Sequence, residues 1–261
     1  MSAEDILSQP QPPPDERVAY GADTNQFLEV RLPRTKAPHT VLLNIHGGYW
    51  RAKYSLANAG HLCEALRAAG VATFNLEYRR VGNTGGGWPG TFEDIRSAYR
   101  FLQQDSRFQL DLDRLVVMGH SAGAQLALCL AAHETSVHSS VQRVVSLAGV
   151  VDLKKAFTLH LSNDAAAEFL GGKPDAVPEH YREADPMELS IPHARQWLLH
   201  GTEDDTVPPE ISRDYVAKKK KAGEAVELME IRRAGHFDLI DPASEAFRQV
   251  RSTVLTALGA K

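Results

Sequence analysis

The sequence predicts an α/β fold with a mostly parallel, twisted sheet of about eight strands and helices on both faces. Short runs rich in β-branched and aliphatic residues alternate with longer amphipathic or alanine-rich runs along almost the whole chain of 261 residues. This alternation is typical of strands joined by helical crossovers, which make neighbouring strands parallel. A hydrophobic content of 43% over this length can bury a sizeable core. Because the strands of a parallel sheet all end at the same edge, we expect ligands to bind at their carboxyl ends.

The expected strands and helices follow one another in a regular order. Apolar, β-branched runs predict an opening hairpin and then single strands, at 17–21, 27–33, 40–48, 71–78, 115–118, 143–150, 195–201 and 226–235. Helical periodicity predicts helices at 56–70, 91–105, 122–132, 208–223 and 242–259. Gly70 ends the first helix, and Pro208 opens the one that carries the lysine run at 218–221. These lysines are expected to form a solvated helix face.

One segment interrupts the alternation. Residues 152–189 run through short amphipathic pieces separated by glycine and proline, as in the stretch EFLGGKPDAVPEHY. We interpret this segment as a lid-like insertion packed over the strand ends, within a single domain at 17–261. The acidic, proline-rich residues 1–16 predict a flexible N-terminal arm.

Composition and charge argue against several classes of function. The net charge of −4 provides no basic field for nucleic acid or an anionic membrane, and no apolar run could span a bilayer. The N-terminus lacks the basic and apolar regions of a secretory signal, so we expect a cytoplasmic protein. Cys63 and Cys129 lack metal-type or redox-type spacing and are expected as buried free thiols, with one disulfide as the alternative. We expect no metal and no cofactor. The oligomeric state stays open, with a homodimer as one option.

Residues 119–123, GHSAG, carry the main functional signal. They match G-x-S-x-G and stand between an apolar strand and an alanine-rich helix. In a nucleophile elbow this pattern forces a sharp turn that exposes the serine oxygen, here that of Ser121, at its tip. Glycines at 119 and 123 are expected because a side chain at either position would collide with the strand or the helix. The alternative is a serine that only caps the helix.

A base and an acid are expected at later strand ends. Among eleven histidines, His236 stands out because it follows the last predicted strand and a glycine, and comes after every acid candidate. The order serine, acid, histidine is that of an α/β-hydrolase triad. For the acid, the stretch HGTEDDTVP favours Asp204, which would accept the Nδ1 proton of the imidazole, with Asp205 as the main alternative. An acidic helix N-terminus would explain Asp205 but not Asp204.

Four stretches together produce a family resemblance: HGGYW at 46–50, GHSAG at 119–123, HGTEDDTVP at 200–208 and GHFD at 235–238. They resemble the α/β-hydrolase superfamily and, within it, the esterase branch that includes kynurenine formamidase (arylformamidase). The resemblance covers most of the chain, and the stretch EYRRVGNTGGGWPGT at 77–91 narrows it further. It implies an α/β-hydrolase fold. The acid pattern of that superfamily, H-G-x-x-D-x-x-V-P, places the acid on Asp204.

An oxyanion hole is expected beside the serine, because acyl transfer develops negative charge on the carbonyl oxygen. One donor should be the backbone N–H of Ala122, directly after the nucleophile. By similarity to esterases with an HGGG motif, the N–H groups of Gly48 and Tyr49 supply the others, and Gly47 shapes the turn. A tyrosine stands here where that pattern has its third glycine. The alternative is an ordinary turn made by two glycines.

Three aromatic residues at strand ends are candidates for the substrate pocket: Tyr49, Trp50 and Trp88. They could wall an apolar pocket or stack on an aromatic group of the substrate. Packing beneath the lid is the alternative, above all for Trp88. The glycine-rich stretch at 81–90 does not match a phosphate-binding loop, and we interpret it as a flexible loop near the site.

The sequence therefore predicts a serine hydrolase that works through an acyl-enzyme, with Ser121 as nucleophile, His236 as base and Asp204 orienting the imidazole. Its substrate is a small molecule, either a carboxylic ester or an aryl amide such as N-formylkynurenine, and the sequence does not decide between them. The alternative from another class is a non-catalytic ligand-binding protein on the same scaffold. The intact serine, acid, histidine and glycine pair argue against it.

Overall fold

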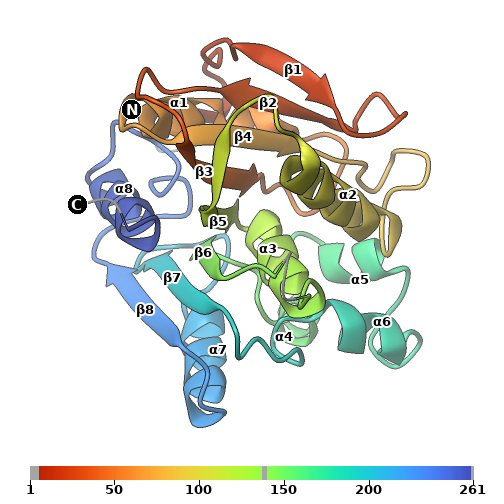
Figure 1. Cartoon of the computed structure of the whole chain (residues 1–261). Helices are drawn as coiled ribbons and strands as arrows, with labels where there is room; N and C mark the ends of the chain where they lie inside the picture. The colour runs from red at the N-terminus through yellow and green to blue at the C-terminus, as the bar shows by residue number, and fades with distance from the viewer. Residues whose placement is uncertain (1–5, 137–139, 260–261) are drawn as a thin grey trace.

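The computed structural model describes residues 6–136 and 140–259, in which one eight-stranded sheet is covered by helices (Figure 1). The strands are β1 (Glu16–Ala19), β2 (Phe27–Arg31), β3 (His39–Ile45), β4 (Ala72–Glu77), β5 (Leu110–His120), β6 (Arg143–Leu147), β7 (Arg195–Gly201) and β8 (Val226–Ile231). Their order across the sheet is β1-β2-β4-β3-β5-β6-β7-β8. The pairs β1–β2 and β2–β4 are antiparallel, and all pairs from β4 across to β8 are parallel. The predicted α/β fold, with its opening hairpin, is confirmed.

Helices lie on both faces of this sheet (Figure 1). The long ones are α1 (Gly60–Ala68), which follows a 3₁₀ turn η2 (Leu56–Ala59), α2 (Gly90–Gln104), α3 (Ala122–His133), α7 (Glu210–Lys221) and α8 (Glu245–Ala257). α1 and α8 pack on one face, where Leu66 and Val254 are buried. α2, α3 and α7 pack on the opposite face, where Leu126 and Ile211 are buried. The strands therefore separate two hydrophobic clusters.

The central strands are buried because both of their faces are covered. All six residues of β4 and the last five of β3 are buried, as expected for strands between two helical layers. Complete burial of an aliphatic side chain contributes about 1.5–3 kcal/mol, so these strands anchor the sheet. β5 begins earlier than the predicted 115–118. A shift in the pairing between Thr40 and Val41 lets its first residues stay hydrogen-bonded to β3.

Local signals set the ends of two helices, and the sequence predicted the first of them. Gly70, with φ of 94°, follows α1, where a left-handed residue closes the helix. Ser244 accepts the N–H of Phe247 at the start of α8, which satisfies one of the free N–H groups there. Both signals depend only on nearby residues, which is why Gly70 could be predicted from the sequence.

Three short helices form the insertion between β6 and β7: α4 (Leu153–Thr158), α5 (Ala165–Leu170) and α6 (Pro178–Ala184). Asp152 caps α4 by accepting the backbone N–H of Lys155. Gln125 on α3 donates to Ala184 O at 2.7 Å, which ties α6 to the helix that follows Ser121. Figure 1 shows α5 and α6 close to one another beside α3.

The described part of the N-terminal segment packs against the sheet and helices, in contrast to the flexible arm expected for residues 1–16. Ile6 is 3% exposed and belongs to the hydrophobic cluster of α1 and α8. Arg31, fully buried on β2, donates to Pro12 O at 2.7 Å. A buried guanidinium needs acceptors, and the segment supplies one, so it is held in place. Residues 1–5 lie outside the described residues.

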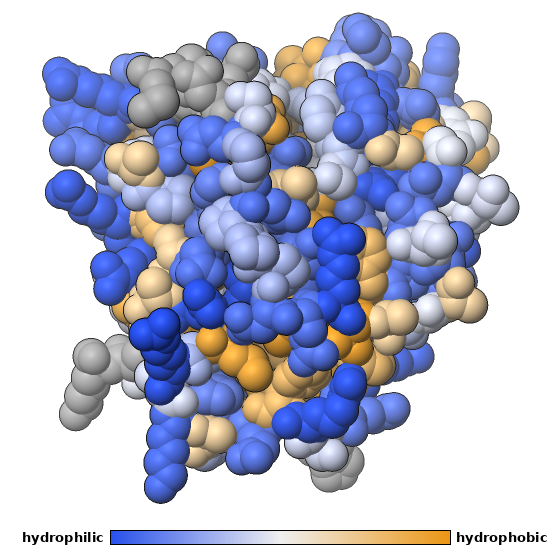
Figure 2. Space-filling model, turned by 90° about the horizontal axis from the view of Figure 1, so that it is seen from above, coloured by the Kyte–Doolittle hydropathy of each residue, from blue (hydrophilic) through white to orange (hydrophobic). Residues whose placement is uncertain are grey.

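The outer hairpin presents a polar surface. β1, at the edge of the sheet, exposes three of its four residues, and the charged Glu16 and Arg17 are among them. Charged side chains on an edge strand oppose pairing with another chain. Figure 2, which views the molecule from above relative to Figure 1, shows a mainly hydrophilic face with a hydrophobic area toward the lower middle of the view.

Within the described residues, no helix combines the length and the apolar character needed to cross a membrane.

Candidate active site

Ser121 occupies the sharp turn between β5 and α3. Its φ is 56°, in the left-handed range, and its N–H donates to Leu147 O on β6 at 2.8 Å. A Cβ at Gly119 would lie 2.1 Å from Gly123 O, and one at Gly123 would lie 2.1 Å from Ile45 O, so both positions require glycine. The side chain of Ser121 makes no capping hydrogen bond to α3. The turn is therefore a strained elbow, and the alternative of a capping serine is wrong.

The structure pairs His236 with Asp204. His236 Nδ1 lies 2.7 Å from Asp204 Oδ2, and both side chains are buried. The other carboxylate oxygen, Oδ1, accepts the N–H of Thr206 at 2.9 Å and that of Val207 at 2.8 Å. Asp205 is exposed, and its carboxylate accepts the hydroxyl of Thr206 at 3.4 Å. The geometry thus selects Asp204, and not Asp205, as the partner of the imidazole.

His200 is a second partner of Asp204. Its Nε2 lies 3.1 Å from Asp204 Oδ2 and 2.9 Å from Val207 O, and its Nδ1 lies 2.7 Å from Ser212 Oγ. Burial alone would raise the pKa of Asp204, but hydrogen bonds from His200 and His236 outweigh it and hold this pKa well below its ordinary value. Asp204 is therefore ionised at neutral pH, as an acid that orients an imidazole must be. The sequence analysis did not single out His200; the H-x-x-x-D spacing in HGTED was the signal for this contact.

Ser121 and His236 line one cavity of about 220 Å³. Its wall also includes residues from the loops after β3 and β8, among them Gly47, Tyr54 and Phe237. Since these loops follow the carboxyl ends of their strands, the cavity lies at the edge of the sheet where the sequence predicted it.

His120 is a site residue that sequence reasoning set aside. Its ring lies 4.5 Å from that of His236 between centroids, and its Nε2 lies 3.0 Å from His236 O. Burial, together with the neighbouring His236, lowers the pKa of His120 to about 3. The ring is therefore neutral at pH 7, and Nε2 carries the proton because a carbonyl oxygen only accepts. His120 thus holds the backbone of His236 beside the cavity.

The loop after β3 brings its backbone close to the serine. A Cβ at Gly47 would lie 2.8 Å from His120 O and 3.0 Å from Ser121 Cβ, so glycine permits this approach. Ala122, directly after Ser121, is the first residue of α3, and the first N–H groups of a helix have no intrahelical acceptor. The Gly47 backbone and the start of α3 therefore border Ser121 together.

Gly48 and Tyr49 continue this loop in left-handed conformations, with φ of 111° and 49°, and both line the cavity. A Cβ at Gly48 would lie 2.4 Å from the side chain of Tyr54, so a larger residue would displace the loop. Gly48 O accepts the N–H of Arg51 at 3.0 Å. The Tyr49 hydroxyl donates to Thr206 O at 3.0 Å, and burial raises the pKa of Tyr49 to about 12, so it stays a donor. Tyr49 thereby links the predicted oxyanion loop to the loop of the acid.

A buried charge network supports the same loop. His46 Nδ1 lies 2.7 Å from Gly47 O, and its Nε2 lies 3.0 Å from Glu77 Oε1. Glu77 also pairs with Arg80 at 2.7 Å and accepts the N–H of Leu56 at 3.1 Å. Burial acts to raise the pKa of Glu77, but the attraction of His46 and Arg80 outweighs it, so the pKa is lowered. Sequence reasoning missed Glu77 and Arg80; the available signal was that Glu77 is the one charged residue of its strand, at the carboxyl end.

Of the three aromatic pocket candidates, Tyr49 lines the cavity, whereas Trp50 and Trp88 do not. Trp50 is fully buried and stacks on Phe169 of α5, with 4.6 Å between centroids. Trp88 stacks on Phe92 at 5.2 Å and meets Phe169 edge-on at 6.2 Å. The prediction that Trp50 and Trp88 shape the pocket is therefore wrong, because both rings pack against Phe169 of the insertion. Packing beneath the insertion accounts for them.

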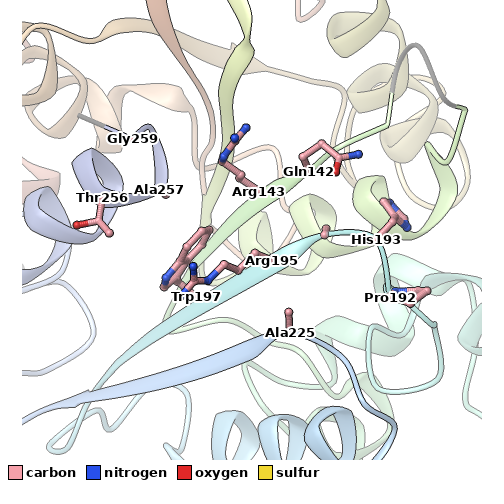
Figure 3. Close-up of a pocket in the computed structure, with 11 residues that line it drawn as sticks. Gln142, Arg143, Pro192, His193, Arg195, Trp197, Ala225, Thr256, Ala257 and Gly259 are labelled. Atoms are coloured by element: carbon pink, nitrogen blue, oxygen red, sulfur yellow. The ribbon is translucent and has the colours of Figure 1, made fainter. Parts of the chain in front are cut away.

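A larger cavity, of about 480 Å³, lies at the amino ends of β6, β7 and β8 (Figure 3). There the Arg195 guanidinium lies 4.9 Å from the centre of the Trp197 ring and pairs with Glu227 at 2.6 Å. Arg143 donates to Asp113 O at 2.7 Å. No serine or cysteine is among the described residues that line this cavity. Elsewhere in the described ranges, no cluster of histidine, cysteine, aspartate and glutamate side chains is suited to hold a metal ion.

The sheet order and the elbow at Ser121 define the chain as an α/β hydrolase by fold. The chain belongs to the BD-FAE family, whose model matches residues 28–218. This match includes Ser121 and Asp204 and ends before His236. The histidine is therefore assigned to the site by its geometry and not by the family match.

Curated relatives include an esterase and a kynurenine formamidase. The chain is 28% identical over 242 residues to the esterase LipQ of Mycobacterium tuberculosis, a match that covers 87% of this chain and 56% of that protein. It is 32% identical over 139 residues to kynurenine formamidase avaC of Aspergillus versicolor, a match that covers 47% of each chain. The chain thus spans about half the length of these relatives.

Solved structures share the fold. A truncated carbohydrate esterase from gut microbiota has a TM-score of 0.80 at 20% identity, over 93% of this chain and 95% of that one. The propionate-bound esterase Est2 of Thermogutta terrifontis has a TM-score of 0.74 at 23% identity, over 94% of both chains. At such identities the likeness establishes the architecture, and the chemistry must be argued from the site.

Proposed function

We propose that the chain is a serine esterase that cleaves a small carboxylic ester through an acyl-enzyme. The observation that carries this proposal is the cavity in which Ser121, His236 and the loop at 47–49 meet, with Asp204 hydrogen-bonded to the far side of the imidazole. A serine nucleophile, an oriented base and backbone N–H donors are the three parts that acyl transfer needs.

The reaction would proceed in two halves. Ser121 Oγ attacks the ester carbonyl while His236 Nε2 takes its proton, and the N–H groups of Gly48, Tyr49 and Ala122 stabilise the oxyanion. The C–O bond to the alcohol then breaks, and the imidazolium returns the proton to the leaving oxygen. Water, deprotonated by the same imidazole, attacks the acyl-enzyme and releases the acid and the free serine.

A carboxylic ester is favoured over an aryl formamide. The BD-FAE match covers residues 28–218 and the esterase LipQ covers 87% of the chain, whereas the formamidase avaC covers 47%. The cavity of about 220 Å³ is smaller than the roughly 300–1,000 Å³ of pockets for drug-sized ligands, which supports a small substrate. N-formylkynurenine is the second candidate, because the identity to avaC reaches 32% over the part that matches.

A substrate panel tests this proposal. Hydrolysis of p-nitrophenyl acetate, butyrate and octanoate is compared with that of N-formylkynurenine at matched concentrations, for the intact chain and for Ser121→Ala. We expect kcat/KM for the best ester to exceed that for the formamide by about tenfold or more. A preference for the formamide would replace the ester by the second candidate. Absence of any Ser121-dependent turnover would favour a non-catalytic binding protein.

The cytoplasmic location and the homodimer considered above stay predictions. Cell fractionation tests the location, and sedimentation equilibrium tests the oligomeric state.

A further inference from the structure

The insertion contains a short segment of strained backbone. Between α4 and α5, His160, Ser162, Asn163 and Asp164 all have left-handed conformations, with φ of 53°, 49°, 55° and 58°. Histidine, asparagine and aspartate tolerate this conformation better than most residues, but serine has no such preference. Strained conformations persist when the surrounding structure holds them, and they cluster at ligand clamps and active sites. We therefore asked what holds this segment and what it faces.

The segment faces the catalytic cavity through one side chain. Ser162 lines the cavity that also contains Ser121 and His236, and it is the lining residue that the insertion contributes. Phe169 on α5 of the insertion instead packs on Trp50 and Trp88. Any movement of the segment that carries Ser162 would therefore change the size of the cavity.

One guanidinium holds the segment in place. Arg51 donates from Nη1 to Ser162 Oγ at 2.9 Å, from Nη2 to Asn163 O at 3.4 Å and from Nε to Glu168 Oε2 at 2.5 Å. The planar fork of arginine suits several fixed acceptors at once, which a lysine ammonium cannot reproduce. Arg51 itself is fixed to the predicted oxyanion loop, because its backbone N–H donates to Gly48 O. The strained segment is thus attached to the loop that borders Ser121.

We propose that Arg51 and Ser162 form a clamp that limits the size of the ester group admitted on this side of the cavity. The proposal rests on the esterase function proposed above. With the clamp closed, Ser162 is held in the cavity wall although its backbone is strained. Without the guanidinium, the segment can relax toward ordinary backbone conformations, and the wall moves outward. Arg51 is in this sense a positioning residue, and Ser162 is the residue that sets the limit.

Two substrate series test the clamp. The first varies the acyl group, from p-nitrophenyl acetate to octanoate, and the second varies the alcohol, from phenyl acetate to 1-naphthyl acetate. For each variant, kcat/KM for the larger substrate of a series is divided by kcat/KM for the smaller one. This ratio is then divided by the same ratio for the intact chain, so that the intrinsic reactivity of the substrates cancels, and the result is called the quotient. We expect Arg51→Ala to raise this quotient about tenfold in one of the two series. Ser162→Ala, which removes the hydroxyl that accepts from Arg51 Nη1, should raise the quotient in the same series.

A matched control separates the clamp from general loosening of the insertion. Lys155 on α4 pairs with Asp214 on α7 at 2.6 Å, and neither residue lines the cavity. Asp214→Asn removes an ion pair between the insertion and the rest of the domain but leaves Arg51 in place. We expect both quotients to stay within about twofold of one for this variant. An equal shift for Asp214→Asn and Arg51→Ala would overturn the clamp.

Further variants keep the test decisive. Glu168→Gln removes the charge at the outer end of the clamp and should shift the quotient in the same direction as Arg51→Ala, so it serves if Arg51→Ala does not fold by circular dichroism. If turnover of the acetates depends on Ser121 and neither quotient changes in any clamp variant, the clamp is refuted while the esterase stands. If Ser121→Ala retains turnover, the proposed function fails instead.

Discussion

The two ends of the sheet carry cavities that differ in size and in chemistry. The cavity at the amino ends of β6, β7 and β8 measures about 480 Å³, more than twice the roughly 220 Å³ of the cavity at the carboxyl ends. In the larger one, Arg195 is neutralised by Glu227. The smaller one is lined by Ser121 and by His236, whose imidazole is hydrogen-bonded to the buried, ionised Asp204. Function is thus indicated by converging reactive groups and not by volume.

Backbone strain distinguishes the same two regions. Tyr49, Ser121 and Ser162 line the smaller cavity with φ of 49°, 56° and 49°. Among the described residues that line the larger cavity, no non-glycine residue has a positive φ. A strained backbone conformation is unfavourable and persists only where surrounding contacts hold it. The concentration of such residues around the smaller cavity therefore indicates that the fold maintains a strained geometry there.

The largest difference between the two ends should follow from Ser121→Ala. Loss of the nucleophile is expected to lower kcat for a p-nitrophenyl ester by about 10⁴-fold or more. Arg143→Ala, in the larger cavity, is the control and should keep kcat within about twofold, because its guanidinium contacts no group of the smaller cavity. Steady-state kinetics at saturating substrate measure both. Comparable losses for the two variants would contradict the assignment of the active site.

The acid offers a second comparison, between neighbouring residues. Asp204→Asn should lower kcat by about 10³–10⁴-fold, because the imidazole loses the group that fixes its tautomer and stabilises its positive charge. Asp205→Asn should change kcat by less than about twofold, since Asp205 is exposed and does not contact His236. Equal, mild effects of the two substitutions would show that the acid lies elsewhere.

The oxyanion loop should show an intermediate effect. Gly47→Ala places a methyl group 2.8 Å from His120 O, so the loop must move away from Ser121. We expect kcat to fall by about 10²-fold, the scale of losing one oxyanion donor, with a smaller change in KM. Thermal unfolding of the variant should be measured in parallel, and Gly259→Ala, at a distant turn, serves as a glycine control. Unchanged kcat in a folded Gly47→Ala would remove this loop from the mechanism.

The smallest expected effect concerns stability and comes from His120. Its pKa is about 3 in the folded chain and 6.5 ordinarily, so between these values the unfolded chain binds a proton that the folded chain does not. The free energy of unfolding should therefore fall with decreasing pH, by about 1.4 kcal/mol per unit from this ring. His120→Asn should remove that part of the slope between pH 6.5 and 4.5 in urea titrations, whereas Arg143→Ala should leave it. An unchanged slope in His120→Asn would contradict the burial argument.

Prediction from the sequence succeeded where a short stretch contains its own physical cause. The run GHSAG fits an elbow because Gly119 and Gly123 leave room for backbone atoms that a side chain would displace. The alternation of strands and helices, and the opening hairpin, follow from local periodicity in the same way. The acid and the base could be proposed because each follows a predicted strand, and in a parallel sheet such positions gather at one edge.

Prediction failed where the outcome depended on which distant surface covers a residue. Trp50 follows a strand, as Tyr49 does, yet the insertion buries Trp50 against Phe169. His120 could not be assigned to the site from sequence, because its partner is the backbone of a residue 116 positions later in the chain. A stretch of sequence specifies which groups can interact, but not which of many possible partners lies next to them in the folded chain.

For this protein, the sequence by itself determined the layered α/β fold, the strained turn at Ser121 and the acid and base candidates, because local sterics and periodicity decide these features. Only the tertiary structure paired Asp204, the acid that the sequence favoured, with His236, brought Glu77 beneath the predicted oxyanion loop through His46, and placed the Arg51 guanidinium on the insertion. These choices depend on burial and on hydrogen-bond partners far apart in the chain. They are therefore settled only when the whole sheet and its covering helices are assembled.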